Sequence, residues 1–198
     1  MSAVIRLAGD GDAAAVAAIY GPFVDGNATS FEAEPPSADE MRRRIGETTE
    51  MYPWLVCDSG GVIAGYAYAS WHRTRLAYRW SVETSVYVDP NFRRCGVARG
   101  LYTSLFAILA AQGYVNAYAG ITLPNEASVG FHEALGFSPV GVYHRIGWKR
   151  GAWHDVMWLE RAVQENLAPP DSPPTPLTGL TPALLAAAIA GSAPTQPC

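Results

Sequence analysis

The chain has 198 residues, of which 49% are hydrophobic, 11% aromatic and 16% charged. This composition fits one globular domain with a full core and excludes a disordered chain, which lacks such apolar content. No apolar run approaches the roughly 20 residues that span a bilayer, and the first residues do not resemble a signal peptide, so we expect no membrane contact.

The charges are unevenly distributed along the chain. The formal net charge is -4, so we expect no general attraction to nucleic acid. Residues 1–70 carry 4 basic and 10 acidic side chains, whereas residues 71–161 carry 10 basic and 6 acidic ones. An anionic ligand is therefore expected in the middle of the chain. The 3 cysteines match neither a disulfide framework nor a metal site, which predicts a cytoplasmic protein with reduced thiols.

Apolar periodicity predicts a mixed order of strands and helices over residues 1–161. In chain order, the patterns predict a strand at 3–7, a helix at 13–20 capped by Asp10, and a helix at 38–47 behind a capping box at Ser37; then strands at 54–58, 62–71 and 81–88, a helix at 96–112, a strand at 115–121, a helix at 125–135, and strands at 137–143 and 153–159. This order predicts an α+β or α/β domain with a mixed sheet.

The last part of the chain has a different composition. Residues 162–198 are rich in proline and alanine and predict an extended C-terminal tail outside the domain of residues 1–161. Within the tail, residues 183–190 form a short apolar helix candidate, which could pack on the domain or fray.

The strongest local signal lies where the predicted strand at 81–88 meets the predicted helix at 96–112. The stretch reads Arg93-Arg94-Cys95-Gly96-Val97-Ala98-Arg99 and fits the pattern R-x-x-G-x-A. A helix start exposes unpaired amides and positive dipole charge, a glycine lets a phosphate approach the backbone, and arginines add fixed charge. The stretch predicts a pyrophosphate site, although an ordinary turn with solvated arginines has the same pattern. No P-loop or dinucleotide motif occurs.

A second motif, from Asn125 through Ser128 and His132 to Phe137, reads N-x-x-S-x-x-x-H-x-x-x-G-F. Together with the first motif it resembles the acetyl-CoA-dependent N-acetyltransferases of the GNAT superfamily. The segments at 52–56, 77–88 and 147–155 resemble, more narrowly, the phosphinothricin and methionine-sulfoximine acetyltransferases. The resemblance covers about residues 3–160 and implies a mostly antiparallel mixed sheet flanked by helices, with a β-α-β segment for the cofactor.

The resemblance implies roles for particular residues. Acetyl-CoA, as co-substrate, would lie along the strand at 86–88 with its pyrophosphate on the loop at 94–99. Glu83 would be the general base, and His132 stands where many members have a tyrosine acid. The implied cofactor contacts are Val86, Tyr87, Val88, Arg93, Arg94, Cys95, Gly96, Val97, Ala98, Arg99, Asn125 and Ser128. The implied acceptor contacts are Phe31, Arg73, Arg75, Tyr78 and Tyr87. Arg79 stands where some phosphinothricin-specific members have an acidic residue and members that act on methionine derivatives tend to have arginine.

The residue types suit this chemistry. An amine attacks a thioester only when neutral, so a site must remove its proton, and Glu83 can do this directly or through water. Glu83 could instead form a structural ion pair with Arg75 or Arg79. His132 could protonate the leaving thiolate or simply be packed in the core, and the arginines and aromatic residues of the acceptor side could be solvated or structural. Cys95, in the phosphate loop, is not expected to act as a nucleophile.

We therefore expect an acetyltransferase acting directly, in a ternary complex, on the α-amino group of phosphinothricin, methionine sulfoximine or methionine sulfone. The resemblance also implies a homodimer, and we expect residues 148–154 to lie at the interface or to contact the neighbouring subunit. Two alternatives remain: acetylation of another amine or a protein N-terminus, and a non-catalytic acyl-CoA-binding module. No metal site is expected.

Overall fold

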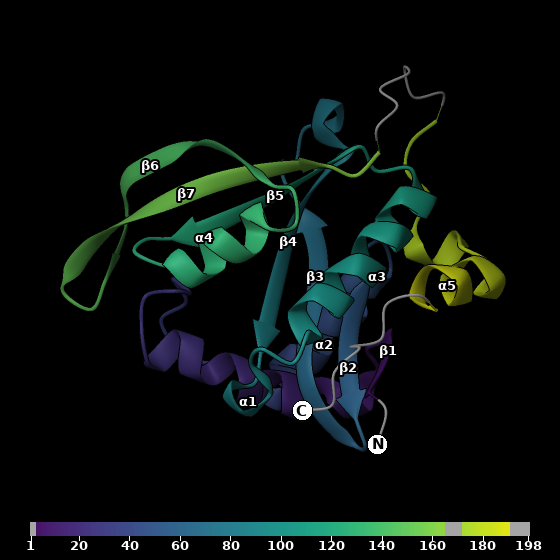
Figure 1. Ribbon diagram of the computed structural model, residues 1–198, viewed down its shortest axis with the longest axis horizontal. Helices are drawn as coiled ribbons and strands as arrows, with labels where there is room; N and C mark the ends of the chain where they lie inside the picture. Colours follow the sequence, from purple (N-terminus) through teal and green to yellow (C-terminus); the bar gives the residue numbers. More distant parts are fainter. Residues whose placement is uncertain (1–2, 165–171, 191–198) are drawn as a thin grey trace.

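The computed structural model describes residues 3–164 and 172–190 (Figure 1). The helices are α1 (Ala13–Asp25), α2 (Ala38–Thr49), α3 (Val97–Gln112), α4 (Glu126–Glu133) and α5 (Pro182–Ile189). The strands are β1 (Ala3–Leu7), β2 (Trp54–Ser59), β3 (Val62–Trp71), β4 (Ser81–Val88), β5 (Asn116–Thr122), β6 (Ser138–Lys149) and β7 (Ala152–Ala162).

The strands form a seven-stranded sheet in the order β1-β2-β3-β4-β5-β7-β6. All neighbouring pairs are antiparallel except β4 and β5, which are joined through α3 and run parallel. Helices cover both faces, with α3 and α4 on one face and α1 and α2 on the other (Figure 1). The mixed, mostly antiparallel sheet predicted from the sequence is therefore confirmed.

Two apolar cores lie on the two faces of the sheet. The core under α3 includes the fully buried Leu101, Leu105 and Leu109, one helical turn apart. The core under α1 and α2 is more aromatic and includes Trp54 and Tyr66. Alternation along β4 sends Val82 and Val86 to the α3 face and Tyr87 to the α1/α2 face.

Strands β6 and β7 form a hairpin that extends beyond the rest of the sheet (Figure 1). Both strands are longer than the alternation of the sequence predicts. The pairing register shifts between Tyr143 and Gly147, where Arg145 has a left-handed backbone (φ 51°), so the period-2 pattern is lost there. Trp148 and Trp153 lie opposite each other near the turn and are more than half exposed.

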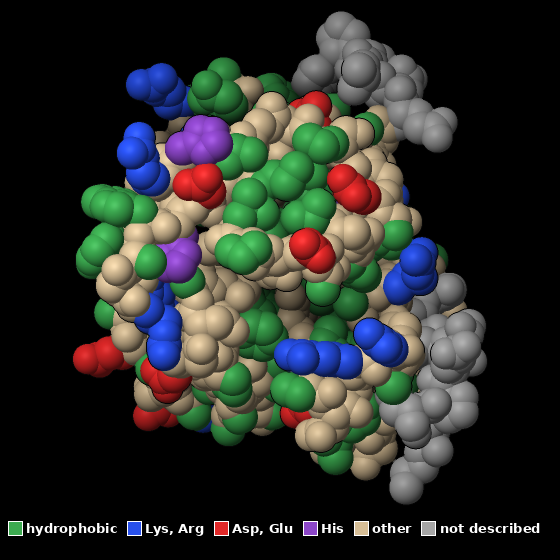
Figure 2. All heavy atoms as spheres, turned by 60° about the vertical axis from the view of Figure 1, so that its left-hand side comes forward, with side chains coloured by type: hydrophobic (Ala, Val, Ile, Leu, Met, Phe, Trp, Pro, Cys, Tyr) green, Lys and Arg blue, Asp and Glu red, His purple; other side chains and the backbone are tan. Residues whose placement is uncertain are grey.

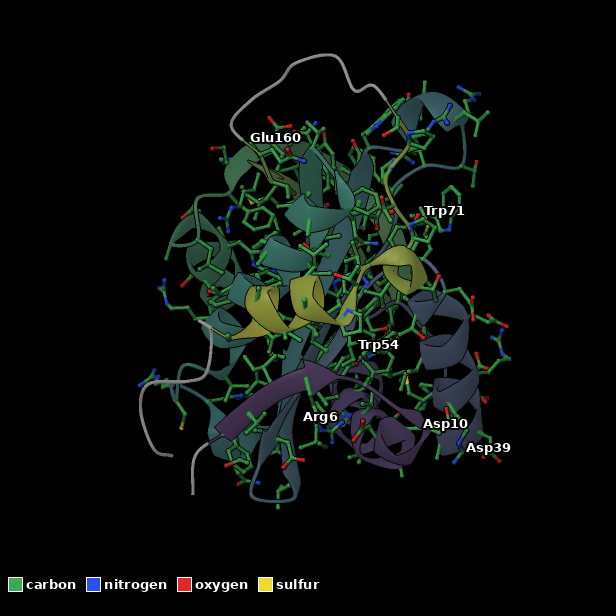
Figure 3. All side chains as sticks on the ribbon, turned by 90° about the vertical axis from the view of Figure 1, so that its right-hand side faces the viewer. Arg6, Asp10, Asp39, Trp54, Trp71 and Glu160 are labelled. Atoms are coloured by element: carbon green, nitrogen blue, oxygen red, sulfur yellow. The ribbon has the colours of Figure 1, made fainter. Side chains whose placement is uncertain are left out.

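The described part of the C-terminal tail packs on the domain. Helix α5 corresponds to the short apolar helix predicted in the tail, and it packs beside α3 (Figure 3). Leu177 and Leu180 join the core under α3. The buried amide of Gln112 donates to the carbonyls of Met51 and Thr175, both at 2.8 Å, and so connects α3 to this segment. The remaining tail residues lie outside the described residues.

The first helix differs from its predicted form at both ends. Asp10 begins a 3-10 turn, and the carboxylate that accepts the Gly9 amide is that of Asp12, which also pairs with Arg6 at 2.7 Å. Helix α1 continues past Tyr20 through Pro22 to Asp25. The capping interaction at Ser37 is confirmed, because its side chain accepts from the Glu40 amide.

None of the described helices combines the length and apolarity needed to cross a membrane. Across the same residues, no three His, Cys, Asp or Glu side chains are grouped so that they could bind a metal ion.

Candidate active site

Strands β4 and β5 separate part of the way along the sheet. They pair only at Ser81–Glu83 and Asn116–Tyr118, and the Thr84 hydroxyl then donates to the Tyr118 carbonyl at 3.3 Å. Beyond that point β4 pairs with β3 alone, through Val86, Tyr87 and Val88. The free edge of β4 can therefore pair with an extended ligand as another strand would.

A cleft occupies the space between the two strands. Its lining residues come from β4, β5, α3, α4 and the loop after α1: Thr29, Thr84, Ser85, Val86, Tyr87, Tyr102, Ala119, Gly120, Ile121, Thr122, Asn125, Ser128 and His132. Because the side chains of Thr84 and Tyr87 point to opposite faces of the sheet, residues from both faces line the cleft.

Helix α3 begins at the end of the cleft where β4 ends. Arg94 (φ 64°) and Gly96 (φ 78°) both have left-handed backbones, and Gly96 is the residue before the first turn of the helix. The amides of Val97, Ala98 and Arg99 have no partner within the helix, because the first helical bond runs from Gly100 to Gly96 at 2.9 Å. These amides and the helix dipole are suited to bind an anion.

The arginines of this loop are exposed. In residues 3–164 and 172–190, no carboxylate lies within ion-pairing distance of Arg93, Arg94 or Arg99. The space-filling view shows basic side chains beside a hollow on one face of the molecule (Figure 2). Cys95 donates its thiol to the Arg93 carbonyl at 3.6 Å and lies in this loop, away from the space between the strands.

Helix α4 holds His132 on the α3 side of the cleft. Asn125 begins α4 and accepts the Ser128 amide at 3.2 Å. His132 is 4% exposed; its Nδ1–H donates to the Ser128 carbonyl at 2.8 Å, so Nε2 accepts from the Tyr102 hydroxyl at 3.1 Å. Burial lowers the pKa of His132, which keeps the ring neutral. Tyr102 and His132 thus form a hydrogen-bonded pair that reaches the cleft.

Glu83 lies on the opposite face, where β4 and β5 begin to separate. Its carboxylate is 3.2 Å from Nδ1 of His72, the residue that follows β3. Burial raises the pKa of Glu83, and the nearby Arg73 guanidinium partly opposes this. A carboxylate with a raised pKa can accept a proton close to neutral pH. The structure thus pairs Glu83 with a histidine rather than with Arg75 or Arg79.

The predicted acceptor residues are brought together in part. Tyr87 packs edge-on against Tyr20 and Phe23 under the cleft. Tyr78 lies near His72, with ring centres 6.5 Å apart, and the Arg73 guanidinium is 3.4 Å from the Tyr143 hydroxyl of β6.

Two predicted residues stand apart from that group. Phe31 covers Gly147 of the hairpin, where a Cβ would overlap its ring. Among the described residues, no hydrogen bond, ion pair or ring contact joins the Arg75 side chain to the others.

A lysine at the hairpin tip fixes the loop that leads to the cleft. The Lys149 ammonium donates to the carbonyls of Val24, Ser30 and Glu32, at 2.7, 2.7 and 2.8 Å. The first of these carbonyls is in the last turn of α1, where the helix dipole favours a cation. The loop between them includes Thr29, which lines the cleft and accepts from the Thr122 hydroxyl at 3.4 Å.

Four residues near the site carry no sequence signal. His72 stacks on Tyr118, with ring centres 4.3 Å apart, and lies edge-on to Trp158 at 5.8 Å. Tyr102 reads in the sequence as an ordinary core residue of α3. The hydrogen-bond partners of His72 and Tyr102, Glu83 and His132, are 11 and 30 positions away along the chain, so the fold brings them together.

The fold and this site together define an acyltransferase. The model of the acetyltransferase (GNAT) domain matches residues 5–158, so the chain belongs to the GNAT acetyltransferase family. The family predicted from the two sequence motifs is confirmed.

Among curated relatives, phosphinothricin N-acetyltransferase of Streptomyces viridochromogenes is 39% identical over 174 residues, 88% of this chain and 94% of that protein. L-methionine sulfoximine/L-methionine sulfone acetyltransferase of Pseudomonas aeruginosa is 38% identical and covers 88% of this chain and 100% of its own. Among solved structures, the phosphinothricin acetyltransferase of Sinorhizobium meliloti in complex with AcCoA has a TM-score of 0.79 and 34% identity, over 88% of this chain and 94% of that one.

Proposed function

We propose that the chain acetylates the α-amino group of a small amino-acid analogue, such as phosphinothricin, methionine sulfoximine or methionine sulfone, by direct transfer in a ternary complex. The observation that carries the proposal is the cleft between β4 and β5. A neutral histidine lines it, the amides that begin α3 lie at its end on the same face of the sheet, and a carboxylate with a raised pKa lies on the other face, where the two strands begin to separate. Two substrates can approach such a cleft from opposite sides.

The residues on the α3 side fit acetyl-CoA, which supplies the acetyl group as a thioester. The unpaired amides at Val97–Arg99 and the exposed arginines suit its pyrophosphate. The free edge of β4 at Val86–Val88 suits the amide groups of its extended arm. The side-chain oxygen of Asn125 caps α4, which leaves its NH₂ group to contact the reactive end.

The remaining steps are assigned to two groups. Glu83 accepts the proton of the acceptor ammonium, which frees the amine for attack on the thioester. As the C–S bond breaks, the leaving thiolate takes the proton of the Tyr102 hydroxyl, and Tyr102 takes up the second proton lost by the attacking nitrogen. The Tyr102–His132 pair, in which Nε2 of His132 orients the hydroxyl, therefore ends neutral as it began. No covalent enzyme intermediate is required, because the amine itself reaches the thioester.

The acceptor lies on the Glu83 face. Arg73 is suited to bind its carboxylate or phosphinate, and Tyr78 and Tyr87 are suited to enclose its side chain. Burial of a polar acceptor group next to these residues would discriminate strongly between related amino acids.

We also propose a homodimer in which the β6–β7 hairpin contacts the second copy. β6 is an edge strand, and the hairpin exposes Tyr143, Ile146, Trp148 and Trp153 by 45 to 60%. Exposed aromatic residues on an extended edge favour association. Sedimentation velocity should give the mass of a dimer, and Trp148→Ser with Trp153→Ser should reduce it to that of a monomer.

The experiment that tests the reaction is release of free thiol from acetyl-CoA in the presence of a panel of amino-acid analogues, peptides and simple amines. We expect one or two analogues to be used far faster than the rest. Equal rates for all compounds, or turnover of peptides alone, would overturn the proposed acceptor class. Glu83→Gln should lower kcat by at least about 100-fold without changing acetyl-CoA binding. A binding module without catalysis would show CoA binding but no thiol release in either form.

A further inference from the structure

A histidine ring faces Glu83 across the start of the cleft. Ser70 of β3 pairs with Glu83 of β4, and alternation places the side chain of His72 on the same face as that of Ser70. The His72 side chain is only 12% exposed, and its Nδ1 lies 3.2 Å from the carboxylate of Glu83. This distance is at the long end for a hydrogen bond and is compatible with tightening when substrate fills the site.

Three aromatic side chains fix the orientation of the imidazole. It stacks on Tyr118 of β5 with an interplanar angle of 14°, and Trp158 of β7 and Tyr78 lie edge-on to it. A ring held by stacking on one strand and by edge contacts from two other elements has little freedom to rotate. Its Nδ1 therefore keeps facing Glu83.

The charge states favour donation from the ring to the carboxylate. Burial lowers the pKa of His72, and the adjacent Arg73 lowers it further, so the imidazole is neutral at neutral pH. A neutral imidazole that faces a carboxylate carries its proton on the nitrogen nearer to the oxygen. The other titratable side chains that face the pair are Tyr78 and two tyrosines, Tyr118 of β5 and Tyr68 of β3, whose pKa values are raised by burial.

We propose that His72 is a positioning residue for Glu83: its Nδ1–H holds the carboxylate toward the cleft and stabilises the ionised form that accepts the acceptor's proton. The inference rests on the proposed role of Glu83 as the base. It assigns a function to a residue that neither sequence motif contains. The imidazole transfers no proton itself and does not contact the reacting atoms.

A matched pair of variants tests this role. In His72→Asn the side-chain amide lies where Nδ1 lies in histidine, so the donor is kept; in His72→Gln it lies nearer the place of Nε2, so the donor is displaced. Both replacements are polar, similar in size to histidine and unable to ionise. The measurement is kcat/KM for the best acceptor between pH 6 and 9, with acetyl-CoA binding as a control.

We expect His72→Gln to lower kcat/KM by about tenfold, since a hydrogen bond to a charged group contributes that much. The acidic limb of its profile of kcat/KM against pH should move up by about one pH unit, because loss of a donor to the carboxylate raises the pKa of that carboxylate. The kcat/KM of His72→Asn should stay within about threefold of the native value, and the acidic limb of its pH profile should lie where it lies in the native enzyme. Acetyl-CoA binding should be unchanged in both variants. An unmoved limb in His72→Gln, or an Asn variant as impaired as the Gln variant, would overturn the inference.

Glu83→Gln separates this inference from the proposed function. If Glu83→Gln retains native turnover, Glu83 is not the base and the proposed mechanism fails. If Glu83→Gln is slow while His72→Gln behaves as the native enzyme, only the role of His72 fails. If both roles are correct, the variant that combines Glu83→Gln with His72→Gln should be no slower than Glu83→Gln alone, because the two groups act as a unit.

Discussion

Two groups of three arginines in this chain differ in whether carboxylates lie next to them. The α2 arginines, Arg42, Arg43 and Arg44, all pair with carboxylates within or beside α2. In the part of the chain that the structure describes, the loop arginines Arg93, Arg94 and Arg99 have no acidic partner. The sequence shows similar density of charge in both places, so the number of arginines does not distinguish a surface ion-pair network from a ligand site.

The difference has an electrostatic meaning. Arg43 and Arg44 lower the pKa of Glu40 to about 2, so the charges of the α2 arginines are balanced within the protein. The loop arginines lie at the positive end of the α3 dipole, where three cations repel one another and the helix end. These arginines are therefore suited to bind an anion, and the two groups should respond differently to substitution.

The largest expected effect comes from the backbone beneath the loop arginines. Gly96→Val should raise the KM for acetyl-CoA by about 100-fold, because a branched side chain strains the left-handed backbone and covers the amides of α3. Gly61→Val is the matched control: Gly61 has a φ of 92° in the β2–β3 turn, with no atom within 4 Å of an added Cβ. It should lower the melting temperature to a similar extent but leave KM unchanged, and a similar KM effect in both variants would contradict the anion site.

Removing single charges should separate the two groups. Arg94→Ala and Arg99→Ala should each raise the KM for acetyl-CoA by about tenfold, as expected for loss of a charge-assisted contact. Arg43→Ala removes the same charge from α2 and should leave KM unchanged. The KM values of the native enzyme and Arg43→Ala should rise with added NaCl, whereas the two loop variants should respond less. Equal KM values for all three variants would show that the groups do not differ.

The smallest expected effect concerns the stability of α2. Arg44 lowers the pKa of Glu32 from its ordinary value of 4.5, mainly through a hydrogen bond, so the pair stabilises the fold above pH 4.5 and loses this effect as the pH falls through the lowered pKa. Arg44→Ala should lower the free energy of unfolding by about 0.5–1 kcal/mol at pH 7, since the pair is partly exposed. Arg44 also pairs with Glu40, whose pKa is about 2, so part of the effect remains until that pH is reached. Urea unfolding at pH 7 and pH 2 measures this, and a difference as large at pH 2 as at pH 7 would contradict an ionic cause.

Much of the fold could be predicted because its signals are local. Strand β4 has the predicted bounds, and α3 begins one residue after its predicted start. The hairpin was predicted too short because the alternation fails around Arg145, where the backbone itself departs from a regular strand. The end of α1 was predicted too early because Gly21 and Pro22 normally interrupt a helix.

In the candidate site, too, the parts within one segment of the sequence could be predicted and the parts that join distant segments could not. The loop from Arg93 to Arg99 could be found from sequence because one short segment contains all its parts. The pairs Glu83–His72 and Tyr102–His132 could not, because each joins two elements that only the sheet and its helices bring together. Family resemblance supplied Glu83 and His132 but not the residues that orient them.

Because of the contacts of Lys149, we expect the far end of the hairpin and the loop after α1 to unfold locally together. Three backbone carbonyls share one ammonium, so none of them can exchange it for water without disturbing the other two. Fraying at the tip of the hairpin therefore reaches the rim of the cleft at Thr29, more than half the chain away in sequence, and hydrogen exchange should occur at a common rate in both segments.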